Sequence, residues 1–249
     1  MTDTILNQDL GNGIAVMTLN RGPVNAISAG FLADVEAHLK RLENDPAVRG
    51  VIVASAFKVF SAGLDLKEAQ VFSLEDQVTI VDNFTTAFAA MYRFPKPVVA
   101  AVSGAAIAGG LFFVLSADYA VTHPDARFGL AEVRVGASFP VGPLEIARAT
   151  LPAPALNRLM LTGRPVTAHK AMDIGFIDEV VAAGDILQRA EAAALDLIQT
   201  PPKTYATIKL QARAPALAII DEAIANKSDP LRQGWFTDET KAAMKAMIG

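Results

Sequence analysis

The chain has 249 residues, of which 52% are hydrophobic, and a formal net charge of −4. This composition predicts one large globular domain or one domain with a small appendage, and the acidic balance argues against a nucleic-acid-binding protein. Cysteine is absent, which excludes disulfides, thiolate metal sites and a cysteine nucleophile, and neither a membrane span nor a leader peptide is recognisable, so we expect a cytoplasmic protein without membrane contact.

The first part of the sequence predicts strands that alternate with helices. Residues 5–19 are typical of a β-hairpin around a Gly-Asn-Gly turn. Ser28 is placed to cap a helix whose apolar side chains recur at helical spacing as far as Leu42. Residues 50–56 form a continuous apolar run, which indicates a strand buried on both faces.

The middle of the chain repeats this pattern. A second long helix is expected after Ser73, and it should stop at the Phe-Pro-Lys-Pro sequence of residues 94–97. Apolar strands are expected at residues 97–104 and 118–123. Alternation of strands and helices favours an α/β fold with short crossovers.

The later part of the sequence becomes helical. Residues 153–163 predict a helix with a glycine stop, Thr167 is placed to cap another, and residues 184–200 predict an amphipathic helix. Beyond them we expect helices broken at Pro215 and Pro230. A helical tail of this size often packs on another subunit.

Two glycine-containing turns are candidate sites. The sequence Ser61-Ala62-Gly63 and the pair Gly109-Gly110 combine small residues, which let a ligand approach the backbone. A helix that begins behind the second turn would present free N–H groups and a partial positive charge. Two such turns facing each other would form an oxyanion hole, although two closely packed turns without a ligand explain the pattern equally well.

Glu132 is a carboxylate among apolar neighbours, in the sequence Phe-Gly-Leu-Ala-Glu-Val. Such a group reaches solvent or has its pKa raised by desolvation, and a raised pKa suits a general base that works near neutral pH. An ordinary ion pair with Arg134 is an equally good interpretation of the sequence.

Motifs of other enzyme classes are incomplete. The three histidines, His38, His123 and His169, lie far apart without the spacing of metal ligands, so we expect no metal site. Ser103 lacks the first glycine of a nucleophile elbow, and we interpret it as a hydrogen-bonding residue at the end of a strand.

Five stretches in order resemble the crotonase superfamily, the enoyl-coenzyme A (CoA) hydratases and isomerases. They are LNRGPVNAIS, GVIVASAFKVFSAGLDLKE, PVVAAVSGAAIAGGLFFVLSADYAV, ARFGLAEVRVGASFP and LTGRPVTAHKAMDIGFIDEVV. The resemblance covers essentially the whole chain. It implies an α/β fold with a crotonase-like ββα spiral core over residues 1–195, followed by a helical trimerisation region over residues 196–249.

The resemblance also implies roles for individual residues. Leu64 and Gly109 match the positions whose backbone amides form the family's oxyanion hole, and Glu132 matches one of the two glutamates of the hydratases. Ala26 and Ala62, together with Leu64, match backbone that binds the adenine and pantetheine parts of CoA. The neighbouring candidates for substrate binding are Gly63, Asp65, Lys67, Gly110 and Phe112.

Position 112 departs from the hydratase pattern. Hydratases carry their other glutamate there, whereas this chain has Phe112. A single carboxylate, Glu132, can instead take a proton from C2 of the acyl chain and return it at C4. The pattern resembles the mitochondrial-type 3,2-enoyl-CoA isomerase, so we expect an isomerase of fatty acid metabolism that converts 3-enoyl-CoA to trans-2-enoyl-CoA.

Other functions and the expected partners follow from the same resemblance. The alternatives are an enoyl-CoA hydratase or another enolate-forming enzyme of the family, and a catalytically inactive protein that binds acyl-CoA. An acyl-CoA thioester is the expected partner, and no cofactor is expected beyond the CoA of the substrate. A homotrimer or a dimer of trimers is expected. Trp235 and Phe236 are candidates for contacts between subunits, with a role in the core of one subunit as the alternative.

Overall fold

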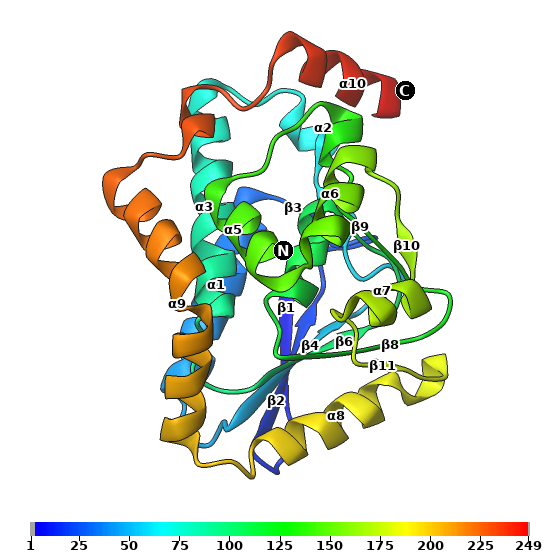
Figure 1. Ribbon diagram of the computed structural model, residues 1–249, viewed down its shortest axis with the longest axis vertical. Helices are drawn as coiled ribbons and strands as arrows, with labels where there is room; N and C mark the ends of the chain where they lie inside the picture. The colour runs from blue at the N-terminus through cyan, green and yellow to red at the C-terminus, as the bar shows by residue number, and fades with distance from the viewer. Residues whose placement is uncertain (1–2, 249) are drawn as a thin grey trace.

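A six-stranded sheet lies between helices in the computed structural model, which describes residues 3–248 (Figure 1). Its strands, in spatial order, are β1 (Ile5–Asp9), β2 (Ile14–Leu19), β4 (Gly50–Ser55), β6 (Val98–Val102), β8 (Tyr119–Thr122) and β11 (Glu179–Val180). β1 and β2 form the predicted antiparallel hairpin, and all the other neighbours are parallel. The register places Ile52 between Val16 and Val99.

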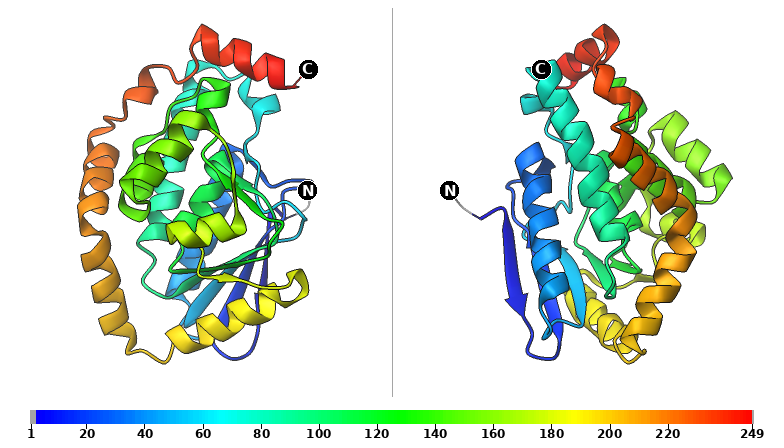
Figure 2. Two further views of the ribbon diagram at one scale, coloured as in Figure 1. Left: turned by 45° about the vertical axis from the view of Figure 1, so that its right-hand side comes forward. Right: turned by 90° about the vertical axis from the view of Figure 1, so that its left-hand side faces the viewer.

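Helices cover both faces of this sheet. α8 (Ile186–Leu197) packs against one face, where Ile52, Val99 and Val121 are buried. α1 (Ala29–Asn44) and α3 (Leu74–Tyr92) lie side by side on the other face (Figures 1 and 2). The central strands are therefore buried on both faces, as their continuous apolar runs predict.

The helix starts follow the predicted caps. The hydroxyl of Ser28 accepts a hydrogen bond from the N–H of Phe31 at the start of α1. Ser73 and Asp76 form a reciprocal capping box at the start of α3. Both caps satisfy N–H groups that have no partner within the helix.

Two small sheets and several short helices form a second layer that carries the turns. β3 (Ala26–Ile27) pairs with β5 (Gly63–Leu64), and β9 (Arg127–Gly129) lies between β7 (Ala106–Ile107) and β10 (Val166–Thr167). The short helices are α2 (Leu66–Ala69), α4 (Phe112–Leu115), α5 (Val141–Thr150), α6 (Ala153–Thr162) and α7 (Ala168–Ile174). The 3₁₀ turns are η1 (Ala108–Leu111), η2 (Glu132–Val135), η3 (Ala183–Asp185) and η4 (Pro230–Gln233).

The C-terminal part corrects one expectation. α9 (Pro202–Asn226) continues through Pro215, so the predicted break there is wrong. Pro215 lies on the exposed side of the helix, whereas Leu217 and Ile220 on the other side are buried. Packing of this buried side outweighs the cost of an interior proline, which is about 3 kcal/mol. The break before Pro230 is confirmed, because α9 ends first and η4 begins at that proline.

A buried ionic cluster fixes α9 to the sheet. Asp118, just before β8, accepts hydrogen bonds from Lys209 (2.6 Å) and from the backbone N–H of Val98 (2.8 Å). The guanidinium of Arg213 lies 2.9 Å from its other carboxylate oxygen. The chain ends in α10 (Asp238–Ile248), which lies over α2 and η2 at one end of the molecule (Figure 1).

Residues 3–248 contain no helix with the length and apolar character needed to cross a membrane.

Candidate active site

The two predicted glycine turns lie against each other. Gly63 has a left-handed φ of 81°, and a Cβ there would lie 2.8 Å from the Cβ of Ala108 and 3.1 Å from the backbone nitrogen of Gly109. A Cβ on Gly109 would lie 2.7 Å from the ring of Phe84. Both glycines are therefore required by the close approach of neighbouring residues.

Backbone contacts join the two turns directly. The N–H of Ile107 donates to the carbonyl of Ser61 at 3.0 Å. A Cβ on Gly110 would lie 2.4 Å from the same carbonyl oxygen, so Gly110 acts by allowing this contact. Ala108, between these residues, has a φ of 50°. This left-handed conformation is uncommon for alanine, and backbone strain of this kind is concentrated at functional sites.

A cavity of about 140 Å³ lies beside the turns. It is lined by Ala62, Leu64, Leu66, Phe84, Ile107, Ala108, Gly109, Phe112, Ala131, Glu132, Val135, Ala137, Phe139, Pro140, Pro143, Trp235 and Met247. Of these residues, Glu132 alone carries an ionisable side chain. The rest of the lining is apolar or backbone, apart from the indole N–H of Trp235, which donates to the carbonyl of Ser138.

Glu132 is buried without a charged partner. It is 7% exposed, and its Oε2 has no hydrogen-bond partner within the described part of the chain. Burial removes water from the carboxylate and raises the pKa of Glu132 to about 8, from an ordinary value of 4.5. A carboxyl group with this pKa changes charge near neutral pH, which is where a general base is most effective.

Arg134 does not form the ion pair that the sequence left open. Its Nε–H donates to the carbonyl of Gly163 at 2.9 Å, and no ion pair to Glu132 occurs among residues 3–248. Glu132 and Arg134 both lie on η2, a single turn of 3₁₀ helix that directs their side chains to different surroundings. Of the two interpretations of the sequence, the structure supports a buried carboxylate whose pKa is raised by desolvation.

The cavity gathers half of the predicted site residues. Ala62, Leu64, Gly109, Phe112 and Glu132 line it. Phe112 is fully buried, with its ring centroid 5.6 Å from that of Phe88 and 6.4 Å from that of Phe139. The predicted residues outside the lining are Ala26, Gly63, Asp65, Lys67 and Gly110.

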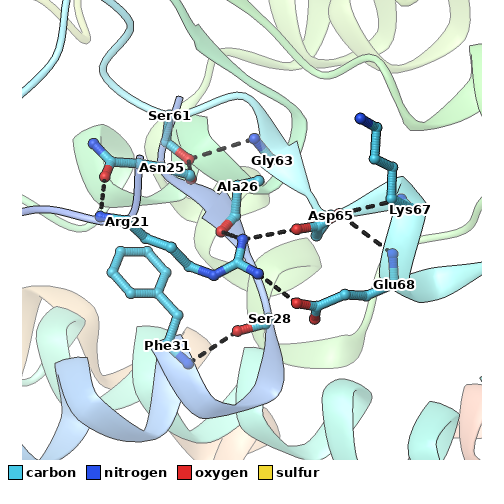
Figure 3. Close-up of polar contacts among 10 residues, drawn as sticks. All are labelled: Arg21, Asn25, Ala26, Ser28, Phe31, Ser61, Gly63, Asp65, Lys67 and Glu68. Atoms are coloured by element: carbon cyan, nitrogen blue, oxygen red, sulfur yellow. Dashed lines mark hydrogen bonds and ion pairs between the residues drawn. The ribbon is translucent and has the colours of Figure 1, made fainter. Parts of the chain in front are cut away.

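An arginine that the sequence reasoning missed ties the loop at Asp65 to β3. Arg21 donates to the carbonyl of Ala26 at 2.7 Å and to the carboxylate of Asp65 at 2.8 Å, and it also pairs with Glu68 (Figure 3). Asp65 in addition caps α2 by accepting from the N–H of Lys67 (Figure 3). Asp65 and Ala26 thus have structural contacts of their own, whereas the Lys67 side chain is exposed and extends away from the cluster (Figure 3).

Part of the lining comes from the C-terminal tail, and this was also missed. Trp235 and Phe236 are 5% and 8% exposed, and their stacked rings have centroids 5.1 Å apart. Both side chains are buried among residues of their own chain, which supports the core role that the sequence left as the alternative. No local pattern in the sequence indicates such a contact, because the partners lie in α3 and in the segment before α5.

This arrangement, two small sheets beside a six-stranded sheet with two glycine turns against an apolar cavity, is the crotonase fold, as solved structures of similar chains show. The human mitochondrial delta3-delta2-enoyl-CoA isomerase has a TM-score of 0.92 at 26% identity, covering 99% of this chain and 97% of that chain. An enoyl-CoA hydratase/isomerase family protein from Pseudomonas syringae has a TM-score of 0.84 at 32% identity, covering 94% and 99%.

The family assignment rests on the sequence as well. A family model described as enoyl-CoA hydratase/isomerase matches residues 9–247, and the chain belongs to this family. A probable enoyl-CoA hydratase of Bacillus subtilis is 30% identical over 201 residues, covering 78% of this chain and 76% of the relative. Another from Mycobacterium tuberculosis is 33% identical over 199 residues, covering 79% and 76%. The resemblance and fold class predicted from the sequence are confirmed.

Proposed function

We propose that this protein is an isomerase that converts 3-enoyl-CoA to trans-2-enoyl-CoA. The observation that carries the proposal is that Glu132 alone supplies an ionisable side chain to the described lining of the cavity, while Phe112 lies in the same lining. Moving a proton between two carbons of one substrate needs one group that accepts and returns it. Adding water calls for a group to activate the water and one to deliver a proton, and hydratases divide this work between two carboxylates.

The reaction begins when the Glu132 carboxylate takes a proton from C2 of the 3-enoyl thioester. The electrons of that C–H bond spread over the C3=C4 double bond and the thioester carbonyl, which gives a dienolate. The backbone amides of Leu64 and Gly109 donate hydrogen bonds to its oxygen. The protonated Glu132 returns the proton at C4, which restores the carboxylate and leaves the double bond between C2 and C3.

The apolar lining supports this proton transfer. Water in the cavity would exchange with the proton held by Glu132 before it reaches C4. Phe112, Phe139 and the other apolar residues of the lining leave few groups to hold such water. The same lining raises the pKa of Glu132, so that one feature serves both proton retention and base strength.

Hydration of 2-enoyl-CoA is the second candidate, because the curated relatives named above are probable enoyl-CoA hydratases. The two activities are separated by measuring isomerisation of 3-hexenoyl-CoA and hydration of trans-2-hexenoyl-CoA on one enzyme preparation. We expect isomerisation to be much the faster. Faster hydration would contradict the isomerase assignment and leave the fold and the family in place.

Replacing the proposed base tests the mechanism. Glu132→Gln should lower the isomerase rate by roughly 10² to 10⁴, the usual contribution of one positioned general base. Binding of a saturated acyl-CoA should be nearly unchanged, because the amide has almost the same shape. Glu145→Gln is the matched control, since Glu145 is also buried but pairs with Arg148 outside the cavity lining. Undiminished activity of Glu132→Gln would exclude the mechanism.

Phe112→Glu tests whether the missing second carboxylate limits the chemistry. The new carboxylate would be buried against Phe88 and Phe139, so its pKa should be raised and folding should be weakened by a few kcal/mol. We expect the ratio of hydration to isomerisation to increase relative to the wild type. An unchanged ratio in a folded variant would show that Phe112 does not decide between the two reactions.

A further inference from the structure

The cavity is small, and its largest lining side chains are aromatic. Its volume of about 140 Å³ is close to the roughly 150 Å³ of an engineered protein cavity that binds benzene, a molecule of six carbons. Four aromatic side chains line it, namely Phe84, Phe112, Phe139 and Trp235. The space therefore suits a short acyl chain, and a long chain would need the wall to move.

Trp235, the largest side chain of the wall, is held on several sides. Its indole N–H donates to the carbonyl of Ser138 at 2.9 Å. Its ring meets Phe84 edge to face, with centroids 5.9 Å apart and planes at 82°, and stacks on Phe236. Rotation of the indole out of the way would break the buried hydrogen bond and both ring contacts.

Gln77 fixes the backbone that carries this indole. Its side-chain oxygen accepts from the N–H of Trp235 at 2.9 Å and from the N–H of Phe236 at 3.0 Å. Gln77 is 7% exposed and lies on α3, the helix that also supplies Phe84 to the cavity. The C-terminal segment and α3 are thus joined into one wall, since each buried hydrogen bond would be costly to leave unmade.

We propose that Trp235 is a specificity-determining residue that limits the acyl cavity to straight chains of about six carbons. This deepens the proposed function and rests on it for the placement of the acyl chain in this cavity. The limit acts on binding, and it therefore holds whichever reaction Glu132 performs. A residue that sets substrate size in this way need not touch the reacting carbons.

The physical expectation is a chain-length optimum. Each methylene that enters an apolar cavity strengthens binding about fourfold. Affinity should therefore rise by roughly tenfold or more from butanoyl-CoA to hexanoyl-CoA. Beyond that length the added methylenes meet Trp235 and its neighbours, so affinity should stop rising and then fall.

Calorimetric binding of saturated thioesters tests this on the full-length protein. Butanoyl-, hexanoyl-, octanoyl-, decanoyl- and dodecanoyl-CoA have no double bond to move or hydrate, so the result is independent of the reaction type. Wild-type protein should bind hexanoyl-CoA most tightly and dodecanoyl-CoA at least about tenfold more weakly. Trp235→Ala and Trp235→Leu should move the optimum to eight carbons or more.

Phe236→Leu is the matched control. Phe236 stacks on Trp235 but does not line the cavity, and the indole keeps its hydrogen bond to Ser138 and its contact with Phe84 in this variant, which should therefore keep the six-carbon optimum. If Trp235→Ala does not fold, the chain-length profiles of Trp235→Leu and of the wild type still test the proposal. Wild-type affinity that climbs steadily to dodecanoyl-CoA, or an optimum that is the same in the Trp235 variants, would overturn the inference. A hydratase with a six-carbon optimum would overturn the isomerase proposal alone.

Discussion

The buried charges of this protein differ in how they are compensated. Asp118 lies between two cations, and Glu145 pairs with Arg148. Glu132, in contrast, has an oxygen without any hydrogen-bond partner in the described structure. A buried unpaired carboxyl group costs folding free energy, and such groups are concentrated at functional sites.

The activity should depend on pH through Glu132. Its pKa of about 8 means that the carboxylate, the form that accepts a proton, becomes the majority only above that pH. We expect kcat/KM for 3-enoyl-CoA to rise with pH and level off above about pH 8. A profile measured from pH 5.5 to 9.5 checks this, and a plateau already reached at pH 6 would contradict it.

The same pKa predicts a pH-dependent stability. Glu132 keeps its proton up to about pH 8 in the native state but only up to about pH 4.5 in the unfolded chain. The stability contributed by protonated Glu132 is therefore complete below pH 4.5 and is lost as the pH rises through about 8. Relative to Glu132→Gln, the wild type should lose up to about 5 kcal/mol of unfolding free energy over this interval. Urea titrations of both proteins at several pH values measure the difference. A constant difference would show that the pKa of Glu132 is not raised.

At the scale of elements, the sequence predicts features whose cause is local. Ser28 and Ser73 begin helices because each hydroxyl satisfies an N–H three residues ahead. Pro215 shows where prediction from local sequence fails, because the local cost of the proline is outweighed by packing of α9 against segments remote in the sequence. Gln77 and Trp235 show it again, since 158 positions separate the two residues joined by that hydrogen bond.

The docking of α9 depends on Asp118. Asp118→Ala would leave Lys209 and Arg213 buried without their counter-charge, and breaking a buried pair in this way costs about 3 to 5 kcal/mol. We expect this loss in the unfolding free energy measured by urea titration. Asp221→Ala is the control, because Asp221 also pairs α9 with α3 through Arg93, but half exposed, and its loss should cost at most about 1 kcal/mol. Equal effects of the two variants would contradict the special role of the buried cluster.

At the scale of the whole molecule, the family pattern predicts more of the site than composition does. The facing turns at Gly63 and Gly109 and the buried Glu132 are all found where the motifs place them. The wall formed by Trp235 is not predictable in this way, because it depends on where the tail returns after α9. A turn or a cap is specified by a few neighbouring residues, whereas a cavity wall is specified by the complete chain path.

The later helices also carry exposed apolar side chains that we propose are covered in an oligomer. Several large apolar side chains are exposed on the later helices, among them Ile208 (58%), Ile219 (48%) and Leu161 (76%). Exposed apolar surface of this kind, when contiguous, marks an interaction site. Because Trp235 is buried within its own subunit, the trimerisation proposed for residues 196–249 would depend on such outer faces.

Light scattering with in-line chromatography should therefore give about three or six times the monomer mass of 26.3 kDa. A charge placed on the covered surface would be expelled from an apolar interface, so Ile208→Glu or Leu161→Glu should shift the population toward monomer at micromolar concentration. Gln211→Glu adds the same charge at an exposed polar position of α9 and should leave the assembly intact.

Hexanoyl-CoA binding, measured on the same samples, should persist in the dissociated variants, because the glycine turns, Glu132 and Trp235 all belong to one chain. A wild-type chain that elutes as a clean monomer would refute the oligomer.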